Sequence, residues 1–239
     1  MALLRWEFAG QQPGTLEKFL PDGMSGERVV QLLVLPSGDA ATGTSVGLLS
    51  SDGRFKRLPI EEFQDLSGRA TSVLKLKEGV SLQRAVLCRD GEDLVVASST
   101  GRLLRLAVND SNLPVMGRNA QGPVLLRLLP GETVVGAVGL EGTGSVVAAS
   151  RQGLILRLPL EGLRRCQRGD IGQIGVRFEQ RGDQLVDLCS GNQPLIGVVL
   201  ADGRSLRLDT NTLEPDPTTG AAQGLGLGAK DQIRELVPV

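Results

Sequence analysis

The chain has 239 residues, with 26 basic and 27 acidic side chains, so its net charge is only −1. This length can bury a sizeable core in one or two domains. The absence of histidine and tyrosine removes the commonest general base and a phenol nucleophile, which argues against an active site in this chain.

The three cysteines, Cys88, Cys166 and Cys189, are far apart and odd in number, and no Cys-x-x-Cys pair occurs. This pattern argues against a disulfide framework or a zinc site and is typical of reduced thiols in the cytosol. No signal peptide follows Met1, and no apolar run approaches the roughly 20 residues of a membrane helix. We therefore expect a cytoplasmic protein with no metal, no cofactor and no membrane contact.

A six-residue phrase, such as Gly101-Arg102-Leu103-Leu104-Arg105-Leu106, recurs along the chain. Its first glycines are Gly53, Gly101, Gly153 and Gly203, which are 48, 52 and 50 residues apart. A period of this length indicates a repeat architecture. Each phrase follows an apolar run and a polar turn such as Ser51-Asp52-Gly53, which predicts a β-hairpin with the phrase as its second strand.

Further motifs complete each repeat. Leu3-Leu4-Arg5-Trp6 resembles the phrase and suggests a fifth, N-terminal copy. A second glycine motif begins 15 to 17 residues after each phrase glycine, and short apolar strands follow it. The sequence therefore predicts an all-β, propeller-like domain over residues 1–239, with about five four-stranded blades in a closed or nearly closed ring. The simplest closure pairs the N-terminal strand, residues 2–8, with the C-terminal blade around Ile233–Leu236.

Strand alternation assigns the two faces of the phrase. The leucines on one face should be buried: Leu104, Leu106, Leu156, Leu158, Leu206 and Leu208. Four arginines then point the other way, one per repeat: Arg57, Arg105, Arg157 and Arg207. Charged residues are common at solvent-facing strand positions, but their recurrence at one repeat position favours a periodic ring of positive charge.

The phrase and the second glycine motif together resemble the C-terminal domain of bacterial type IIA topoisomerase A subunits, the family that includes those of DNA gyrase and topoisomerase IV. The resemblance covers essentially the whole chain. It implies a β-pinwheel, whose blades partly exchange strands, and a non-catalytic domain of an ATP-dependent topoisomerase that binds and bends duplex DNA on its outer rim. It also implies a nucleoid location, contact with the catalytic core, and a monomeric isolated domain.

One motif departs from gyrase. The basic gyrase box, Gln-Arg-Arg-Gly-Gly-Lys-Gly, is replaced in the first repeat by Gly10-Gln11-Gln12-Pro13-Gly14. We therefore expect sequence-independent binding with little wrapping. The side chains expected to contact DNA are Arg57, Arg69, Arg105, Arg118, Arg157, Arg164, Arg165, Arg168 and Arg207.

The distribution of charge supports a positive surface on part of the chain. Residues 151–181 carry a net charge of +4, whereas residues 182–239 carry −4. Reversal of Arg105 and Arg118 to Glu should then weaken binding more than reversal of Lys230 and Arg234. The alternative function is a propeller-like module that binds a protein and no DNA; its few aromatic residues count against this function, because protein interfaces favour them.

Overall fold

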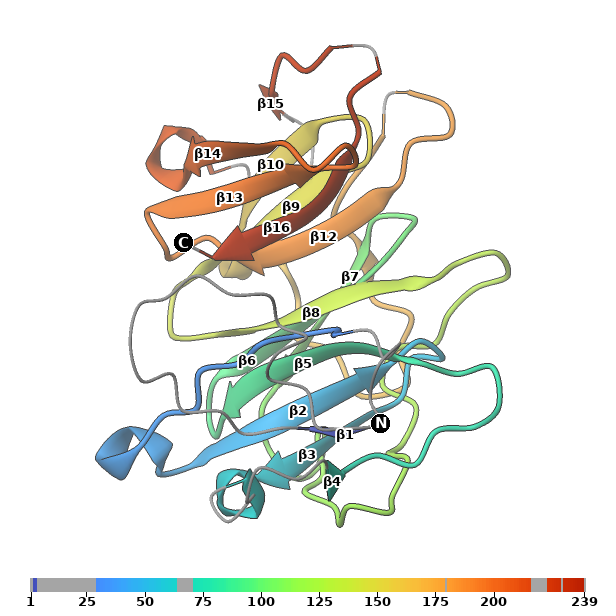
Figure 1. The fold of residues 1–239 in the computed structure, drawn as a ribbon, viewed down its shortest axis with the longest axis vertical. Coiled ribbons are helices and arrows are strands. Elements are labelled where there is room, and N and C mark those ends of the chain that lie inside the picture. Colours follow the sequence, from blue (N-terminus) through green and yellow to red (C-terminus); the bar gives the residue numbers. More distant parts are fainter. Residues whose placement is uncertain are drawn as a thin grey trace.

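The computed structural model describes residues 2–3, 29–63, 71–178, 180–215, 223–228 and 230–238. In these ranges the regular elements are antiparallel strands and short 3-10 helices, and no α-helix occurs. The strands form two four-stranded sheets, two three-stranded sheets and one two-stranded pair (Figure 1). The all-β, propeller-like prediction is confirmed.

Each phrase is the second strand of a hairpin, as its turn residues predict. The four hairpins are β2 (Thr44–Ser50) with β3 (Phe55–Pro59), β6 (Asp93–Ser98) with β7 (Arg102–Ala107), β9 (Ser145–Ser150) with β10 (Leu154–Pro159), and β13 (Leu195–Leu200) with β14 (Ser205–Asp209). The turn glycines, such as Gly101, have a positive φ that other residues rarely adopt.

The first strand of each hairpin also pairs with a later strand from the next repeat. These strands are β5 (Leu82–Arg89), β8 (Val134–Leu140), β12 (Leu185–Ser190) and β16 (Ile233–Pro238). The pairing shifts register at the same place in all four, as between Ala97 and Ser98. We call the sheets of these hairpins blades 1 to 4 in chain order.

The outer edge of a blade is covered by a segment from the following repeat. The pairs are β1 (Ala2–Leu3) with β4 (Thr71–Ser72), β7 with β11 (Gln173–Ile174), and β10 with β15 (Gln223–Gly224). In blade 1 the same place is taken by a bridge between Arg54 and Val124. This exchange of covering segments therefore recurs in blades 1 to 3 and at the N-terminal strand.

The N-terminal strand β1 pairs with a different strand from the one predicted. Leu3 lies opposite Thr71, just as Leu103 lies opposite Gln173, so the N-terminal phrase is in register with the other copies. Its partner is β4, whereas β16 pairs with β13. The predicted pairing with the C-terminal blade is wrong for Ala2 and Leu3, because the segment after each phrase reaches back to the previous phrase. Residues 4–8 lie outside the described part.

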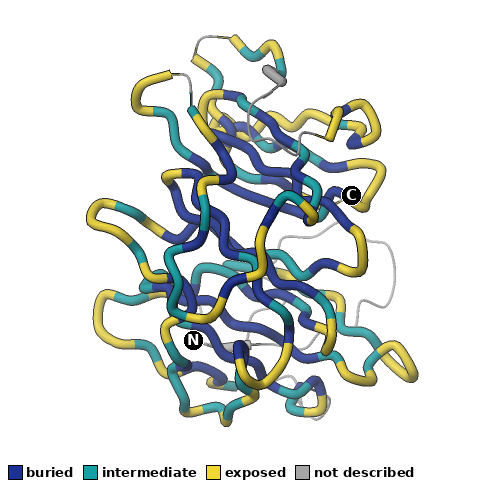
Figure 2. The backbone as a smooth tube through the Cα atoms, turned by 180° about the vertical axis from the view of Figure 1, so that it is seen from behind, coloured by how far each residue is buried: buried dark blue, intermediate teal, exposed yellow. Residues whose placement is uncertain are grey.

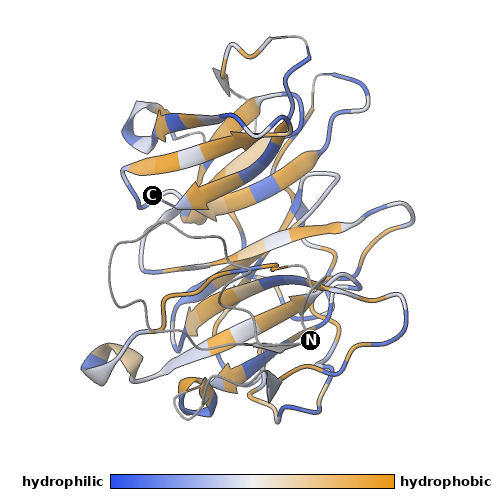
Figure 3. Ribbon diagram, viewed as in Figure 1, coloured by the Kyte–Doolittle hydropathy of each residue, from blue (hydrophilic) through white to orange (hydrophobic). Residues whose placement is uncertain are grey.

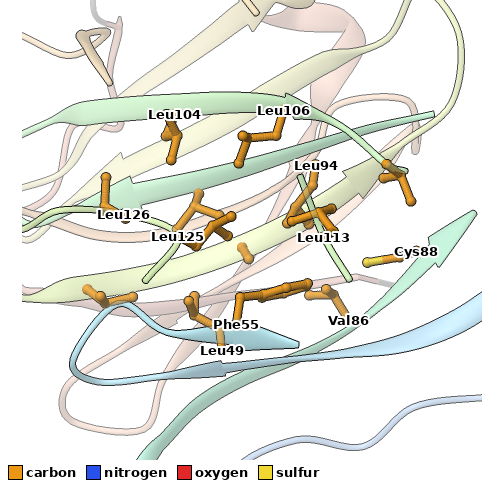
Figure 4. Packing of buried hydrophobic residues seen from close by; sticks show 14 of the residues in the cluster. Leu49, Phe55, Val86, Cys88, Leu94, Leu104, Leu106, Leu113, Leu125 and Leu126 are labelled. Atoms are coloured by element: carbon orange, nitrogen blue, oxygen red, sulfur yellow. The ribbon is translucent and has the colours of Figure 1, made fainter. Parts of the chain in front are cut away.

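The blades stack face to face, and the core lies between them. Strand β8 contacts β5 and β12, and β12 contacts β16, so these strands form the inner side of the stack. Between blades 1 and 2, Phe55 and Val86 pack against Leu94, Leu104 and Leu106 (Figure 4). Buried backbone and apolar side chains follow the strands, and exposed residues concentrate in the connecting turns (Figures 2 and 3). No extensive contact between blades 1 and 4 occurs among the described residues, so ring closure is not established.

The leucine prediction is confirmed in blades 2 and 3 and wrong in blade 4. Leu104, Leu106, Leu156 and Leu158 are at most 2% exposed. Leu206 is 39% exposed and Leu208 is half-buried. The reason is that β14 has only β13 as a neighbour among the described strands, so its outer edge lacks the covering segment.

This difference gives a paired stability prediction. Truncation of Leu104 to Ala should lower the free energy of unfolding by about 2–5 kcal/mol, because it opens a cavity between blades 1 and 2. Leu206→Ala removes a partly exposed side chain and should cost less than about 1 kcal/mol. Urea unfolding of the two variants would measure this, and equal losses would contradict the burial difference.

Candidate nucleic-acid interface

The phrase arginine of blade 1 lies in the interior. Arg57 is 2% exposed, although its strand position predicted a solvent-facing side chain. Its Nε donates to Leu113 O at 2.6 Å, and its Nη atoms donate to Asp90 and Asp110 at 2.5 and 2.8 Å. The segment around Pro114 also bonds the Arg57 backbone, so a stretch more than 50 residues later covers this arginine.

Blades 2 and 3 repeat this arrangement. Arg105 donates to Leu160 O at 2.5 Å, to Leu163 O at 3.0 Å and to the buried Asp93 carboxylate at 2.7 Å. Arg157 donates to Thr210 O at 3.1 Å and is half-buried. A guanidinium supplies five N–H donors, which suits it to binding several carbonyls at once.

The expected ring of exposed phrase arginines is therefore wrong for Arg57, Arg105 and Arg157. Each of these three side chains donates hydrogen bonds to the segment that follows the phrase of the next repeat. It therefore connects its own blade to the neighbouring repeat. Arg207 alone is exposed as expected, and no hydrogen bond from its side chain occurs among the described residues. It lies in blade 4, where the covering segment is missing from the described chain.

Arg102 makes a second internal connection. Its Nε donates to Glu132 at 2.8 Å, its Nη2 bonds the other carboxylate oxygen, and its Nη1 donates to Ile171 O at 2.6 Å. The Glu132 side chain is 3% exposed and also accepts from Thr100 and from Leu129 N–H. Burial raises the pKa of the Glu132 carboxyl, but these hydrogen bonds and the Arg102 charge outweigh it and lower the pKa to about 2.

The lowered pKa predicts acid sensitivity. Glu132 has an ordinary pKa near 4.5, so its stabilisation is fully present above pH 4.5 and is lost as the pH falls through about 2. The contribution is about 3 kcal/mol. In acid titrations followed by circular dichroism, Glu132→Gln should be destabilised at pH 7 and should lose less stability than the wild type below pH 4.5. Glu141→Gln, at a side chain 75% exposed, is the matched control and should behave like the wild type.

The remaining predicted arginines lie on the surface, where most have internal partners. Arg118 is 41% exposed and bonds Glu62 at 2.6 Å. Arg165, 55% exposed, bonds Asp93 at 2.9 Å, and Arg164, 61% exposed, lies 3.6 Å from Asp170. Arg168 is exposed with no ion pair among the described residues, and Arg69 lies outside them.

Sequence reasoning missed a more regular basic position. The N–H groups of Leu125 and Leu126 bond Gly53 O, and those of Gly175 and Val176 bond Gly101 O. The next residues are Arg127 and Arg177, and Lys75 holds the same position one repeat earlier. All three are exposed and have no ion pair in the described chain. We call Lys75, Arg127 and Arg177 the rim basic row; their spacing of 52 and 50 residues was the available signal.

The rim basic row lies at the outer edge of the stack. The strand order β11-β7-β6-β8 places the exchanged segment at the opposite edge from β8, which contacts its neighbours inside the stack. Arg127 N donates to Asp170 O at 3.0 Å, so the row of one repeat touches the glycine motif of the next. Arg127 and Arg168 therefore belong to adjoining segments of one rim.

The described ranges contain no disulfide, no metal-binding group of side chains and no membrane-spanning helix. All three cysteines are free and buried, and burial raises the pKa of Cys88 and Cys189 to about 12. No group of acidic or cysteine side chains there could hold a metal ion. No helix in the same ranges is long and apolar enough to span a membrane.

The fold and the rim define a β-pinwheel of exchanged blades with a basic outer edge. The family model described as "DNA gyrase C-terminal domain, beta-propeller" matches residues 48–89, 92–138 and 144–188, more than half of the chain. The chain belongs to this family.

Individual proteins agree with this assignment. The chain is 31% identical over 190 residues to the A subunit of DNA topoisomerase 4 from Synechocystis, covering 70% of this chain and 21% of that protein. It is 29% identical over 145 residues to the A subunit of DNA gyrase from Pseudomonas aeruginosa, covering 61% and 16%. The chain thus spans about a fifth of these relatives.

Solved structures share the fold. The C-terminal domain of DNA topoisomerase IV superposes with a TM-score of 0.77 at 14% identity, covering 98% of this chain and 71% of that one. The DNA gyrase A C-terminal domain gives 0.72 at 17% identity, covering 84% and 67%.

Proposed function

We propose that this chain is a non-catalytic domain that binds duplex DNA along its outer rim, without sequence preference, and bends it with little wrapping. The observation that carries the proposal is the rim basic row, which places one exposed cation, with no ion pair to the described residues, at the same position of successive repeats. Lys and Arg side chains on a surface neutralise phosphates, and such contacts confer affinity without reading bases.

The proposed contact residues differ from the sequence prediction. The guanidinium groups of Arg57, Arg105 and Arg157 donate to internal acceptors, so these three residues are not among the proposed DNA contacts. Arg118, Arg164 and Arg165 flank the interface with their charge partly neutralised by carboxylates. The rim basic row and Arg168 then make the principal contacts, while Arg69 and Arg207 remain candidate contacts.

In this proposal the chain is one domain of a longer topoisomerase A subunit. The relatives named as A subunits of gyrase and topoisomerase 4 are much longer than this chain, whose matched part covers only 21% and 16% of them, so the domain would act beside the catalytic core of an ATP-dependent type IIA topoisomerase in the bacterial nucleoid. DNA cleavage would belong to that core, because this chain has no tyrosine.

Salt-dependent binding tests the proposal. Fluorescence anisotropy with a duplex of about 40 base pairs should give affinity that falls steeply with salt, with a log–log slope of about −3.6 for four phosphate contacts. Duplexes of unrelated sequence should bind alike, and a relaxed plasmid should gain few chiral topoisomers. Absence of binding at low salt would reject the proposal and favour the protein-interaction module.

A further inference from the structure

Two glycine turns of neighbouring repeats have the same backbone. Ala120 N donates to Gly117 O at 3.1 Å, and Asp170 N donates to Gln167 O at 3.2 Å. Gly122 and Gly172 end the turns with φ of 82° and 74°, and each packs against the backbone of the preceding blade, at Phe55 O and Leu103 O. Residues 118–122 and 168–172 therefore form matching structures.

The turn of residues 168–172 binds an internal oxyanion. The Asp170 carboxylate accepts from Ile171 N–H at 2.6 Å and from Gly172 N–H at 3.1 Å. Successive backbone N–H groups of this kind form a small anion-binding concavity. In the other turn the place of Asp170 is taken by Ala120, so the N–H groups of Gln121 and Gly122 have no carboxylate at this position.

A buried cation lies beneath the turn of residues 118–122 and not beneath the matching turn. Lys56 is 0% exposed, and its Nζ donates to Gly117 O and to Arg118 O, both at 2.8 Å. The equivalent residue beneath the other turn is Leu104. Burial lowers the pKa of Lys56 to about 8, so its amine is still mostly protonated at pH 7. Its charge adds to the positive field of the turn.

Arg118 adds a second cation beside the turn. Its Nε donates to the Glu62 carboxylate at 2.6 Å and its Nη2 to Glu62 O at 3.0 Å. Lys56 lies on β3 of blade 1 and Glu62 lies in the 3-10 helix Ile60–Phe63 that follows this strand, so the preceding repeat holds this turn in place. The Arg118 side chain remains 41% exposed.

We propose that the turn of residues 118–122 binds one oxyanion of a DNA backbone phosphate through the N–H groups of Gln121 and Gly122. Arg118 and the buried Lys56 supply the charge that favours the anion, whereas in the matching turn the Asp170 carboxylate already occupies the corresponding N–H groups of Ile171 and Gly172. The inference rests on the proposed DNA binding and identifies one of its phosphate contacts.

The two turns allow reciprocal substitutions. Ala120→Asp should fill the site with a carboxylate, lower duplex affinity by roughly tenfold at low salt and reduce the salt slope by about 0.9. Asn119→Asp places the same charge on an exposed neighbour and should have a smaller effect with the slope unchanged. In the other turn, Asp170→Ala should raise affinity and add about 0.9 to the slope, and Asp170→Asn, which keeps an acceptor for the N–H groups, should gain less.

A measurement without DNA separates this inference from the proposed function. Titration of the wild type with inorganic phosphate should shift the amide NMR resonances of Gln121 and Gly122, and Ala120→Asp or Lys56→Leu should weaken the shift. Leucine occupies the equivalent position in blade 2, so Lys56→Leu should keep the melting temperature. Shifts without duplex binding would retain the site and reject the proposed function. If phosphate leaves these amides unmoved, or Ala120→Asp and Asn119→Asp affect binding equally, the site is overturned.

Discussion

Substitution of Arg105 by Glu is expected to lower the free energy of unfolding by about 3–5 kcal/mol, because it breaks a buried ion pair and leaves like charges together. The Asp93 side chain is 4% exposed and receives Arg105 Nη2 at 2.7 Å. Burial raises the pKa of the Asp93 carboxyl, but the hydrogen bonds and charges of Arg105 and Arg165 outweigh it and hold the pKa below its usual value. A glutamate at position 105 would replace this attraction with repulsion and free the carbonyls of Leu160 and Leu163.

The chain supplies its own control for this variant. Arg207 holds the same phrase position in blade 4 but is exposed, so Arg207→Glu should change stability by less than about 0.5 kcal/mol. Urea unfolding followed by circular dichroism would compare the two. A stable Arg105→Glu protein that merely binds DNA less well would contradict the internal role and restore the original prediction of a DNA contact.

Simultaneous reversal of Arg127 and Arg177 to Glu is expected to reduce duplex affinity by at least about tenfold at low salt. Both side chains are exposed and make no ion pair in the described chain, so the reversal should leave the fold intact. Loss of two phosphate contacts should lower the log–log salt slope by about 1.8. Anisotropy at several salt concentrations measures both quantities, and the melting temperature checks folding.

Reversal of Arg89 and Arg234 gives a control with the same change in net charge. Both residues are exposed on strands β5 and β16, at the inner edge of their sheets, and each has a carboxylate partner. This control should retain most of the affinity and nearly all of the salt slope. Equal losses in the two double variants would mean that net charge alone governs binding, and the rim basic row would then have no special part.

Local sequence patterns were enough to predict the repeat, the hairpins and the N-terminal copy of the phrase. These features depend on short-range rules: Asp-Gly turns, glycines at positive φ and alternating apolar side chains fix a hairpin within about 20 residues. The register of Leu3 against Thr71 shows that even the isolated copy follows the pattern. The resemblance to the C-terminal domain of the topoisomerase family followed from the order of these motifs.

Which basic side chains face solvent depends instead on the packing of one repeat against another. Alternation assigns a side chain to one face of its own sheet, but it does not say whether a segment from another repeat covers that face. Arg57 is covered by residues near Pro114, and Arg105 by residues near Cys166, in contacts that skip more than 50 residues. Arg127 and Arg177 follow backbone bonds to the phrase glycines and are left exposed beyond the covering segment.

The last blade shows the same division. Its phrase has the same leucines and arginine as those of blades 2 and 3, and the sequence predicted the same burial for them. In the structure β14 has only β13 beside it among the described strands, so Leu206 is 39% exposed and Arg207 is exposed. Burial depends on what packs against a strand, which is a property of the neighbouring repeat, so one local pattern gave two different environments.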